Sequence, residues 1–146
     1  MCLGLTSTRL PMKSSHRFAR IVYAIAGIYG LIVMTPQYWL EDRIGLDSPP
    51  AITHPEYFYG FIGIVIAWQF VFLLIARDPA RYRSLMAITI LEKLAFGVPV
   101  LVLYAGGRVT SSVLGFGALD LVWALLFTIS YLVTSPGRAR VASAAG

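Results

Sequence analysis

Apolar residues in this chain are gathered into four long runs, which are separated by short polar segments. The runs cover residues 18–35, 57–76, 84–105 and 112–133. Each is close to the roughly 20 residues that an α-helix needs to cross a hydrocarbon layer of about 30 Å. The pattern therefore predicts an all-α membrane protein, a four-helix transmembrane bundle.

The first run has a second interpretation. Arg17 and Arg20 lie at its start, and a basic start followed by an apolar stretch is also typical of a secretory signal peptide. The residues that follow, 35–39, contain no small-residue cleavage site. Long basic side chains reach the headgroups from a helix end at little cost. We therefore expect a membrane helix here.

The four spans define one membrane domain, residues 18–134, with tails at 1–17 and 135–146. The loop 36–56 is the longest connection, and its aromatic and apolar residues suit a short amphipathic turn or helix at the membrane surface. Its residues 53–56 read Thr-His-Pro-Glu, which has the spacing of a capping box. This spacing predicts a capped start for the second span.

Basic residues are distributed unevenly between the two expected membrane faces. One face holds Arg9, Lys13, Arg17, Arg20, Arg77, Arg81, Arg83, Arg138 and Arg140, whereas the other holds only Arg43 and Arg108. An excess of lysine and arginine marks the cytoplasmic face, so both termini are expected in the cytoplasm. The formal net charge of +5 then reflects topology and anionic headgroups. No nucleic-acid partner is expected, because the basic residues follow the membrane edges without a binding motif.

Composition narrows the class further. Hydrophobic residues make up 58% of the chain and charged residues 13%, against about 45–50% and about 25% in soluble domains. An ordinary soluble enzyme and a disordered segment are thereby excluded. The single cysteine, Cys2, excludes a disulfide within the chain and a CxxC redox pair. A metal site formed by His54 and loop carboxylates is weak, because the ligand spacing is missing, so no metal is expected.

Three charged residues fall deep within the expected spans: Glu92, Lys93 and Asp120. An unpaired charge at the centre of a membrane helix costs about 2.5–3.5 kcal/mol on insertion scales. A rise of about 1.5 Å per residue places Lys93 and Asp120 within about 6 Å of each other along the membrane normal. An extended lysine side chain covers that gap, so we expect a Lys93–Asp120 ion pair.

Glu92 is left without an obvious partner in this scheme. Adjacent residues on a helix point about 100° apart, so Glu92 and Lys93 are not expected to face each other. Gln69 lies at nearly the same depth and could hydrogen-bond Glu92. A stripe of small residues that includes Gly60 and Gly63 lies nearly opposite Gln69 on the same helix. Either Gln69 or this stripe would meet a partner subunit, and the pattern does not decide between them.

The embedded group of Glu92, Lys93, Asp120 and Gln69 has two interpretations. It is either an ion pair that fixes the register of the helices and does nothing else, or a site that binds a ligand or carries a proton. Ionisable residues inside a membrane are functional candidates by default. Both interpretations require the charges to face the interior of the bundle.

This layout resembles the DoxX-like group of small bacterial four-helix membrane proteins. The likeness covers about residues 17–134 and is carried by the loop end at 53–60 (THPEYFYG), the basic turn at 78–83 (DPARYR) and the segment 91–93 (LEK). The resemblance implies a multi-pass protein of the bacterial inner (plasma) membrane. One branch of the group is associated with a thiosulfate:quinone oxidoreductase, which makes quinone a conceivable cofactor. It implies no catalytic residue in this chain.

Three classes of function remain open. The first is an accessory or binding protein that holds a lipid, a quinone or a partner helix near Glu92, Lys93 and Asp120. The second is a small proton-coupled transporter that uses Glu92, although multidrug transporters of this size carry their glutamate in the first helix. The third is a quinone-linked or isomerase-type membrane enzyme, for which no acid–base constellation is visible. We expect the first.

Overall fold

The computed structural model describes residues 12–47 and 51–135, and the side chains from residue 15 onward. Its elements are α1 (Met12–Met34), η1 (Thr35–Trp39), α2 (Glu41–Asp47), α3 (Pro55–Arg77), α4 (Arg83–Ala105) and α5 (Ser111–Val133). The helices α1, α3, α4 and α5 are long and apolar enough to cross a membrane, and the described residues contain no strand. The predicted all-α, four-helix membrane bundle is thus confirmed.

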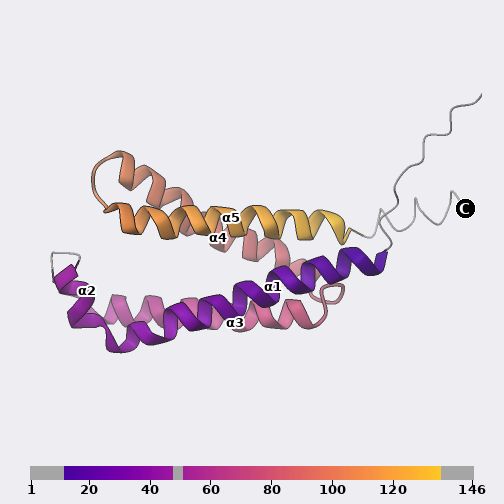
Figure 1. Ribbon diagram of the computed structural model, residues 1–146, viewed down its shortest axis with the longest axis horizontal. Coiled ribbons are helices and arrows are strands. Elements are labelled where there is room, and N and C mark those ends of the chain that lie inside the picture. The colour runs from indigo at the N-terminus through magenta and orange to yellow at the C-terminus, as the bar shows by residue number, and fades with distance from the viewer. Residues whose placement is uncertain (1–11, 48–50, 136–146) are drawn as a thin grey trace, which may run out of the picture.

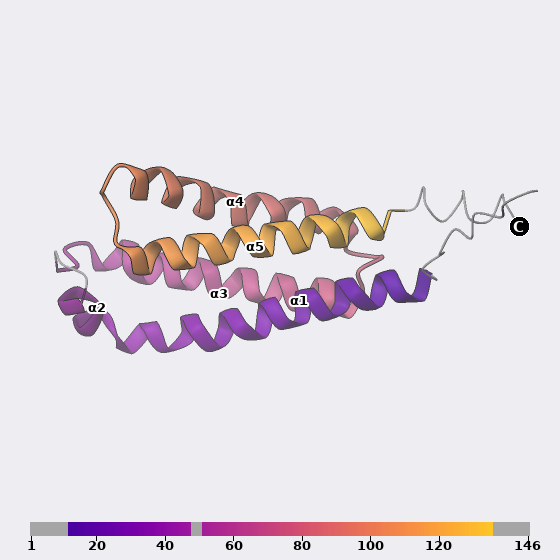
Figure 2. The same cartoon turned by 45° about the horizontal axis from the view of Figure 1, so that its top comes forward.

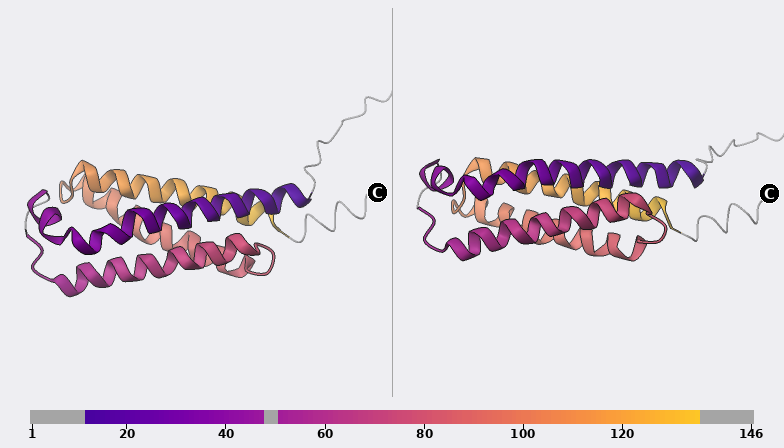
Figure 3. Two further views of the ribbon diagram at one scale, coloured as in Figure 1. Left: turned by 60° about the horizontal axis from the view of Figure 1, so that its bottom comes forward. Right: turned by 90° about the horizontal axis from the view of Figure 1, so that it is seen from below.

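The four long helices are arranged as two pairs. Helix α1 packs mainly against α3, and α4 packs mainly against α5, while α1 and α5 join the pairs (Figures 1 and 2). The start of α1, the end of α5 and the turn at 78–82 lie at one end of the bundle, here called the terminal end. The segment η1–α2 and the connection at 106–110 lie at the other, the loop end (Figure 3).

Aromatic packing fills the terminal half. The rings of Tyr23 and Phe127 are stacked with centroids 4.2 Å apart, and Phe72 meets Phe127 edge-on at 5.1 Å. Thr89 donates its proton to the carbonyl of Met86 (2.8 Å), so the hydroxyl of Tyr23 is the donor in the 2.8 Å bond to Thr89 Oγ1. This half of the bundle is therefore a solid core that joins α1, α3, α4 and α5.

Glycines bring α4 and α5 into close contact. A Cβ atom added at Gly117 would lie 2.5 Å from Val100 Cγ1, and one added at Gly97 would lie 2.8 Å from Leu121 Cδ2. Without the driving force of water exclusion, membrane helices associate through close packing of small residues. At Gly97 and Gly117 the facing helix is too close for a Cβ atom to fit without a shift.

The segment between α1 and α3, for which a short amphipathic turn or helix was expected, contains a short helix. This helix, α2, is tied to α3 by a hydrogen bond from the hydroxyl of Tyr59 to Glu41 Oε2 (2.6 Å). The prediction of a capping box at 53–56 is wrong. Helix α3 begins at Pro55, and its N-cap residue, His54, makes no side-chain capping hydrogen bond. Glu56 instead lies 3.3 Å from the imidazole of His54.

Candidate functional site

The buried face of α4 determines which of its charges points inward. Its buried residues recur every three or four positions and are Met86, Thr89, Lys93, Gly97 and Val100. Lys93 stands at the centre of this face, and its side chain is 7% exposed. Glu92 stands at the edge of the face, with its side chain 15% exposed. Both charged groups therefore lie inside the bundle.

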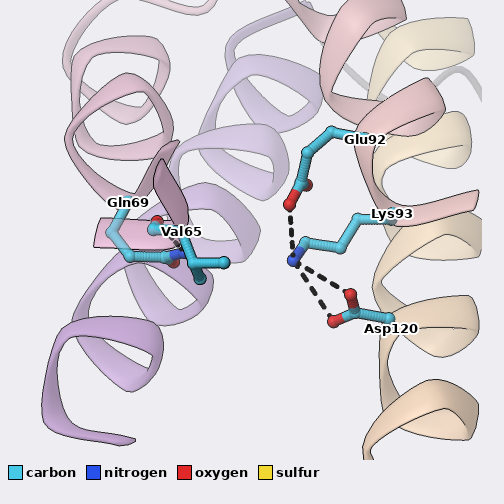
Figure 4. A network of polar contacts seen from close by, with 5 residues as sticks. All are labelled: Val65, Gln69, Glu92, Lys93 and Asp120. Carbon is cyan, nitrogen blue, oxygen red and sulfur yellow. Dashed lines mark hydrogen bonds and ion pairs between the residues drawn. The ribbon is translucent and has the colours of Figure 1, made fainter. Parts of the chain in front are cut away.

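The ammonium group of Lys93 lies between two carboxylates. Its Nζ atom is 3.2 Å from Asp120 Oδ1, 3.3 Å from Asp120 Oδ2 and 3.3 Å from Glu92 Oε1 (Figure 4). The expected contact between Lys93 and Asp120 is confirmed. The expectation that Glu92 and Lys93 do not face each other is wrong, because the long lysine side chain turns its end back towards the neighbouring residue. We call these three residues the ion cluster.

The ion cluster has one cation for two acids. Lys93 also lies over the ring of Phe72, with Nζ 5.3 Å from the centroid, so its positive charge is well compensated. The second oxygen of Glu92, Oε2, is buried and has no hydrogen-bond partner among the described residues. A buried acceptor without a donor carries a desolvation cost of about 1–3 kcal/mol. Glu92 Oε2 is therefore the carboxylate oxygen of the cluster whose hydrogen-bonding capacity is unsatisfied among the described residues.

Gln69 faces the ion cluster from the other helix pair and does not touch it. Its side chain is buried at 2% exposure, and its amide nitrogen donates to the carbonyl of Val65 in the same helix (2.8 Å). Figure 4 shows these two residues on one side and the charged residues on the other. The hydrogen bond expected between Gln69 and Glu92 is absent, because the far end of Gln69 lies against Gly30 of α1.

The placement of Gln69 answers the question that the pattern of α3 left open. Gln69 points into the bundle, so it does not meet a partner subunit. A Cβ atom added at Gly60 would meet nothing within 4 Å among the described residues, so this part of the small-residue stripe faces outward. A partner at that stripe stays a prediction.

A cavity separates Gln69 from the ion cluster. It has a volume of about 220 Å³, lies in the loop half of the bundle and is lined by all four long helices. Its polar wall includes Glu92, Lys93, Asp120, Gln69 and Gln37, and the rest is mainly aliphatic and aromatic. Phe72 forms the boundary with the solid core of the terminal half. The embedded charges thus line a hollow space.

Two aromatic pairs stand at the sides of the cavity, where the helix pairs adjoin. Phe61 of α3 faces Phe96 of α4 with centroids 6.0 Å apart, and Tyr29 of α1 faces Trp123 of α5 at 6.3 Å. Phe61 is 46% exposed and Tyr29 is 37% exposed. The sequence analysis missed all four residues, because an aromatic residue on a membrane helix reveals neither its rotation nor its partner.

Nothing in the described residues suggests a metal centre. No group of three or more His, Cys, Asp or Glu side chains in residues 12–47 and 51–135 could hold a metal ion. His54 lies beside Glu56 at the start of α3, away from the cavity. The chemistry available to the cavity is therefore that of carboxylates, an ammonium group, amides and aromatic rings.

Comparison with protein-family models, with curated proteins and with solved structures found no match to this chain.

Proposed function

We propose that this protein is an accessory or binding protein of the membrane and that it holds the head of an apolar ligand, a lipid or a quinone, in its cavity. The observation that carries the proposal is that the ion cluster lines a cavity and is not enclosed in a solid interface. A cluster that served only to fix helix register would need no space beside it. Glu92, Lys93 and Asp120 are the polar contacts of the proposed site.

The size of the cavity supports this class of ligand. An apolar cavity of about 150 Å³ in another protein holds one benzene molecule. The cavity here is about 220 Å³, which suits one substituted ring or a headgroup of similar size. The apolar tail of such a ligand would pass between the helix pairs, beside Phe61 and Phe96 or beside Tyr29 and Trp123. A ligand dissolved in the bilayer reaches these positions without crossing water.

A small proton-coupled transporter that uses Glu92 is the second candidate. The unpartnered Oε2 atom of Glu92 favours it, because a proton or a cationic substrate would complete that atom. The packed rings of Tyr23, Phe72 and Phe127 oppose it, because they close the terminal half of the bundle. Transport would require this core to open, whereas binding does not.

The binding proposal is tested by blocking the cavity. Val33→Trp places a large ring in its wall, and Ile32→Trp places the same ring on the outward side of α1, where Ile32 is 68% exposed. After extraction in native lipid discs, the wild type and Ile32→Trp should retain an apolar ligand in native mass spectra, and Val33→Trp should lose most of it. Equal occupancy in all three proteins would contradict the proposal.

We further propose that the chain lies in a bacterial inner membrane, as its resemblance to DoxX-like proteins implies. We also propose that its terminal end faces the cytoplasm, as the excess of lysine and arginine at that end predicts. The basic residues of the terminal end support this orientation. There, Arg20 donates to the carbonyl of Arg77 (2.7 Å), and Arg83 donates to that of Tyr131 (3.1 Å). Arginines that anchor helix ends in this way suit an anionic cytoplasmic surface.

Cysteine labelling tests the orientation. In a Cys2→Ser background, Leu46→Cys places a thiol on α2, where Leu46 is 79% exposed. Arg81→Cys places one in the exposed turn at the terminal end. In intact spheroplasts a membrane-impermeant maleimide should label position 46 and spare position 81 until the membrane is opened. The reverse pattern would show that the terminal end faces outward.

A further inference from the structure

A second pocket lies at the terminal end of the bundle, where the turn at 78–82 joins α3 to α4 (Figure 1). Its walls are Leu74, Arg77, Asp78, Arg81 and Tyr82, and we call it the basic pocket. Its volume is about 450 Å³, within the range of about 300–1,000 Å³ that is usual for small-molecule sites. None of its residues lines the cavity beside the ion cluster, so the two sites are separate.

The turn holds Arg81 in a fixed position beside the end of α3. Asp78 Oδ1 accepts a hydrogen bond from the backbone N–H of Arg81 (3.2 Å), and the carbonyl of Asp78 accepts one from the backbone N–H of Tyr82 (3.1 Å). Pro79 is buried, and a proline disfavours the helical conformation in the residue before it. Asp78 is accordingly extended (φ −147°, ψ 84°), which ends α3. One oxygen of the Asp78 carboxylate is thus used by the backbone of the turn.

The guanidinium groups of Arg77 and Arg81 are available to a ligand. Both residues are exposed, and neither side chain makes a hydrogen bond or an ion pair with another described residue. Arg83 is by contrast engaged with α5, because it donates to the carbonyl of Tyr131 (3.1 Å) and lies over the ring of that residue at 3.9 Å. With two guanidinium groups and one carboxylate, the basic pocket carries a net positive charge. A guanidinium group pairs with phosphate through two parallel hydrogen bonds.

The helix ends around the basic pocket also favour an anion. The last carbonyl groups of a helix carry a partial negative charge, and its first N–H groups carry a partial positive one. At the end of α3, Arg20 donates to the carbonyl of Arg77 (2.7 Å) and so compensates the negative end. At the start of α4, Tyr82 makes no side-chain capping hydrogen bond and the first turn contains no acidic residue, so the positive end of this helix keeps its charge.

We propose that the basic pocket binds the phosphate group of an anionic phospholipid. This inference concerns a second site and goes beyond the ligand proposed for the cavity. Arg77 and Arg81 bind the phosphate oxygens at the level of the headgroups. Leu74 is 39% exposed and lies about 4.5 Å deeper along α3, where it gives the pocket an apolar wall for the start of an acyl chain. A free phosphate ion would gain nothing from that wall, so a lipid is the favoured source of the group.

Native mass spectrometry of the full chain, released from detergent micelles, tests this proposal. The protein is titrated with dioleoylphosphatidylglycerol and with dioleoylphosphatidylcholine, which share their acyl chains and differ in net charge. A basic residue near the membrane surface adds about fivefold to the affinity for an anionic lipid, so the wild type should prefer phosphatidylglycerol by at least about that factor. The preference should be the same in Val33→Trp, because the blocked cavity is a separate site.

Substitutions in the basic pocket should change this preference in opposite directions. Arg77→Gln and Arg81→Gln should each lower the affinity for phosphatidylglycerol by about fivefold, and the two combined should abolish the preference. Asp78→Asn retains the acceptor oxygen of the turn and removes the negative charge, so it should bind phosphatidylglycerol more tightly than the wild type does. Arg108→Gln is the matched control, because it removes one exposed positive charge at the loop end, and it should keep the preference of the wild type.

Three outcomes would overturn the proposal. A preference that survives in the combined Arg77→Gln and Arg81→Gln variant, or that falls equally in Arg108→Gln, would show that the headgroup does not depend on the basic pocket. A preference lost in Val33→Trp would place the headgroup in the cavity, and the binding function of the cavity would still stand. Displacement of phosphatidylglycerol by an equal concentration of glycerol phosphate, which lacks acyl chains, would show that the pocket takes a free phosphate group and not a lipid.

Discussion

Replacement of Lys93 by methionine is expected to lower the free energy of unfolding by about 3–5 kcal/mol, which is the cost of removing one partner from a buried ion pair. Lys93 is the only cation within reach of Glu92 and Asp120 in the described part of the chain, and its side chain is 7% exposed. Without it, two carboxylates face each other across a space of low dielectric constant. Steric trapping of the reversibly unfolding protein in bicelles measures this change in the free energy of unfolding.

The control for this prediction removes the charges together. Lys93→Met combined with Glu92→Gln and Asp120→Asn leaves no ionised group in the cluster, and it should recover most of the lost stability. A single Lys93→Met protein as stable as the wild type would show that the ion cluster contributes little. A triple variant no more stable than the single one would show that the lysine acts through packing.

Gly117→Ala is expected to cost about 1–3 kcal/mol, the usual range for overpacking a well-packed interface. The added Cβ atom would lie 2.5 Å from Val100 Cγ1 and 2.8 Å from Val100 Cβ, so α4 and α5 must move apart. A valine on a helix has little rotational freedom with which to yield. Thermal unfolding followed by circular dichroism in a mild detergent should show a lower midpoint.

Gly115→Ala is the matched control on the same helix. A Cβ atom at Gly115 would meet nothing within 4 Å among the described residues, so this substitution should leave the midpoint unchanged or raise it slightly. Both variants replace glycine by alanine in α5, so the gain in helix propensity is the same in each. The difference between their midpoints then reports the packing against α4. Equal midpoints for the two variants would show that α4 and α5 are not in close contact at Gly117.

Much of the fold could be predicted from the apolar pattern, because membrane thickness sets the length of each run. The depth of a residue follows from its position along a span, which is why the contact between Lys93 and Asp120 could be anticipated. The rotation of each helix about its axis does not follow in the same way. Gln69 was placed at the depth of Glu92, yet it lies against Gly30 on the far side of the cavity.

The cavity itself was beyond sequence reasoning for a related reason. It exists because α1 pairs with α3 and α4 pairs with α5, whereas α3 and α4 make little contact although a short turn joins them. The sequence of each span does not reveal which successive spans stay apart. The contact between Glu92 and Lys93 was missed because the flexibility of the lysine side chain was not considered. The angle between neighbouring residues concerns their Cβ atoms, whereas a lysine side chain has enough rotatable bonds to return to the same side.

The packed terminal half fixes the two helix pairs to each other at one end of the bundle. The stacked rings of Tyr23 and Phe127 hold the two helix pairs together at one end, and beside the cavity the pairs meet at the aromatic contacts of Phe61 with Phe96 and of Tyr29 with Trp123. Over about 15 Å of helix, a tilt of roughly 10° shifts the far end by about 2.6 Å. A small change in the angle between the two helix pairs would therefore alter the width of the hollow half much more than that of the packed terminal half.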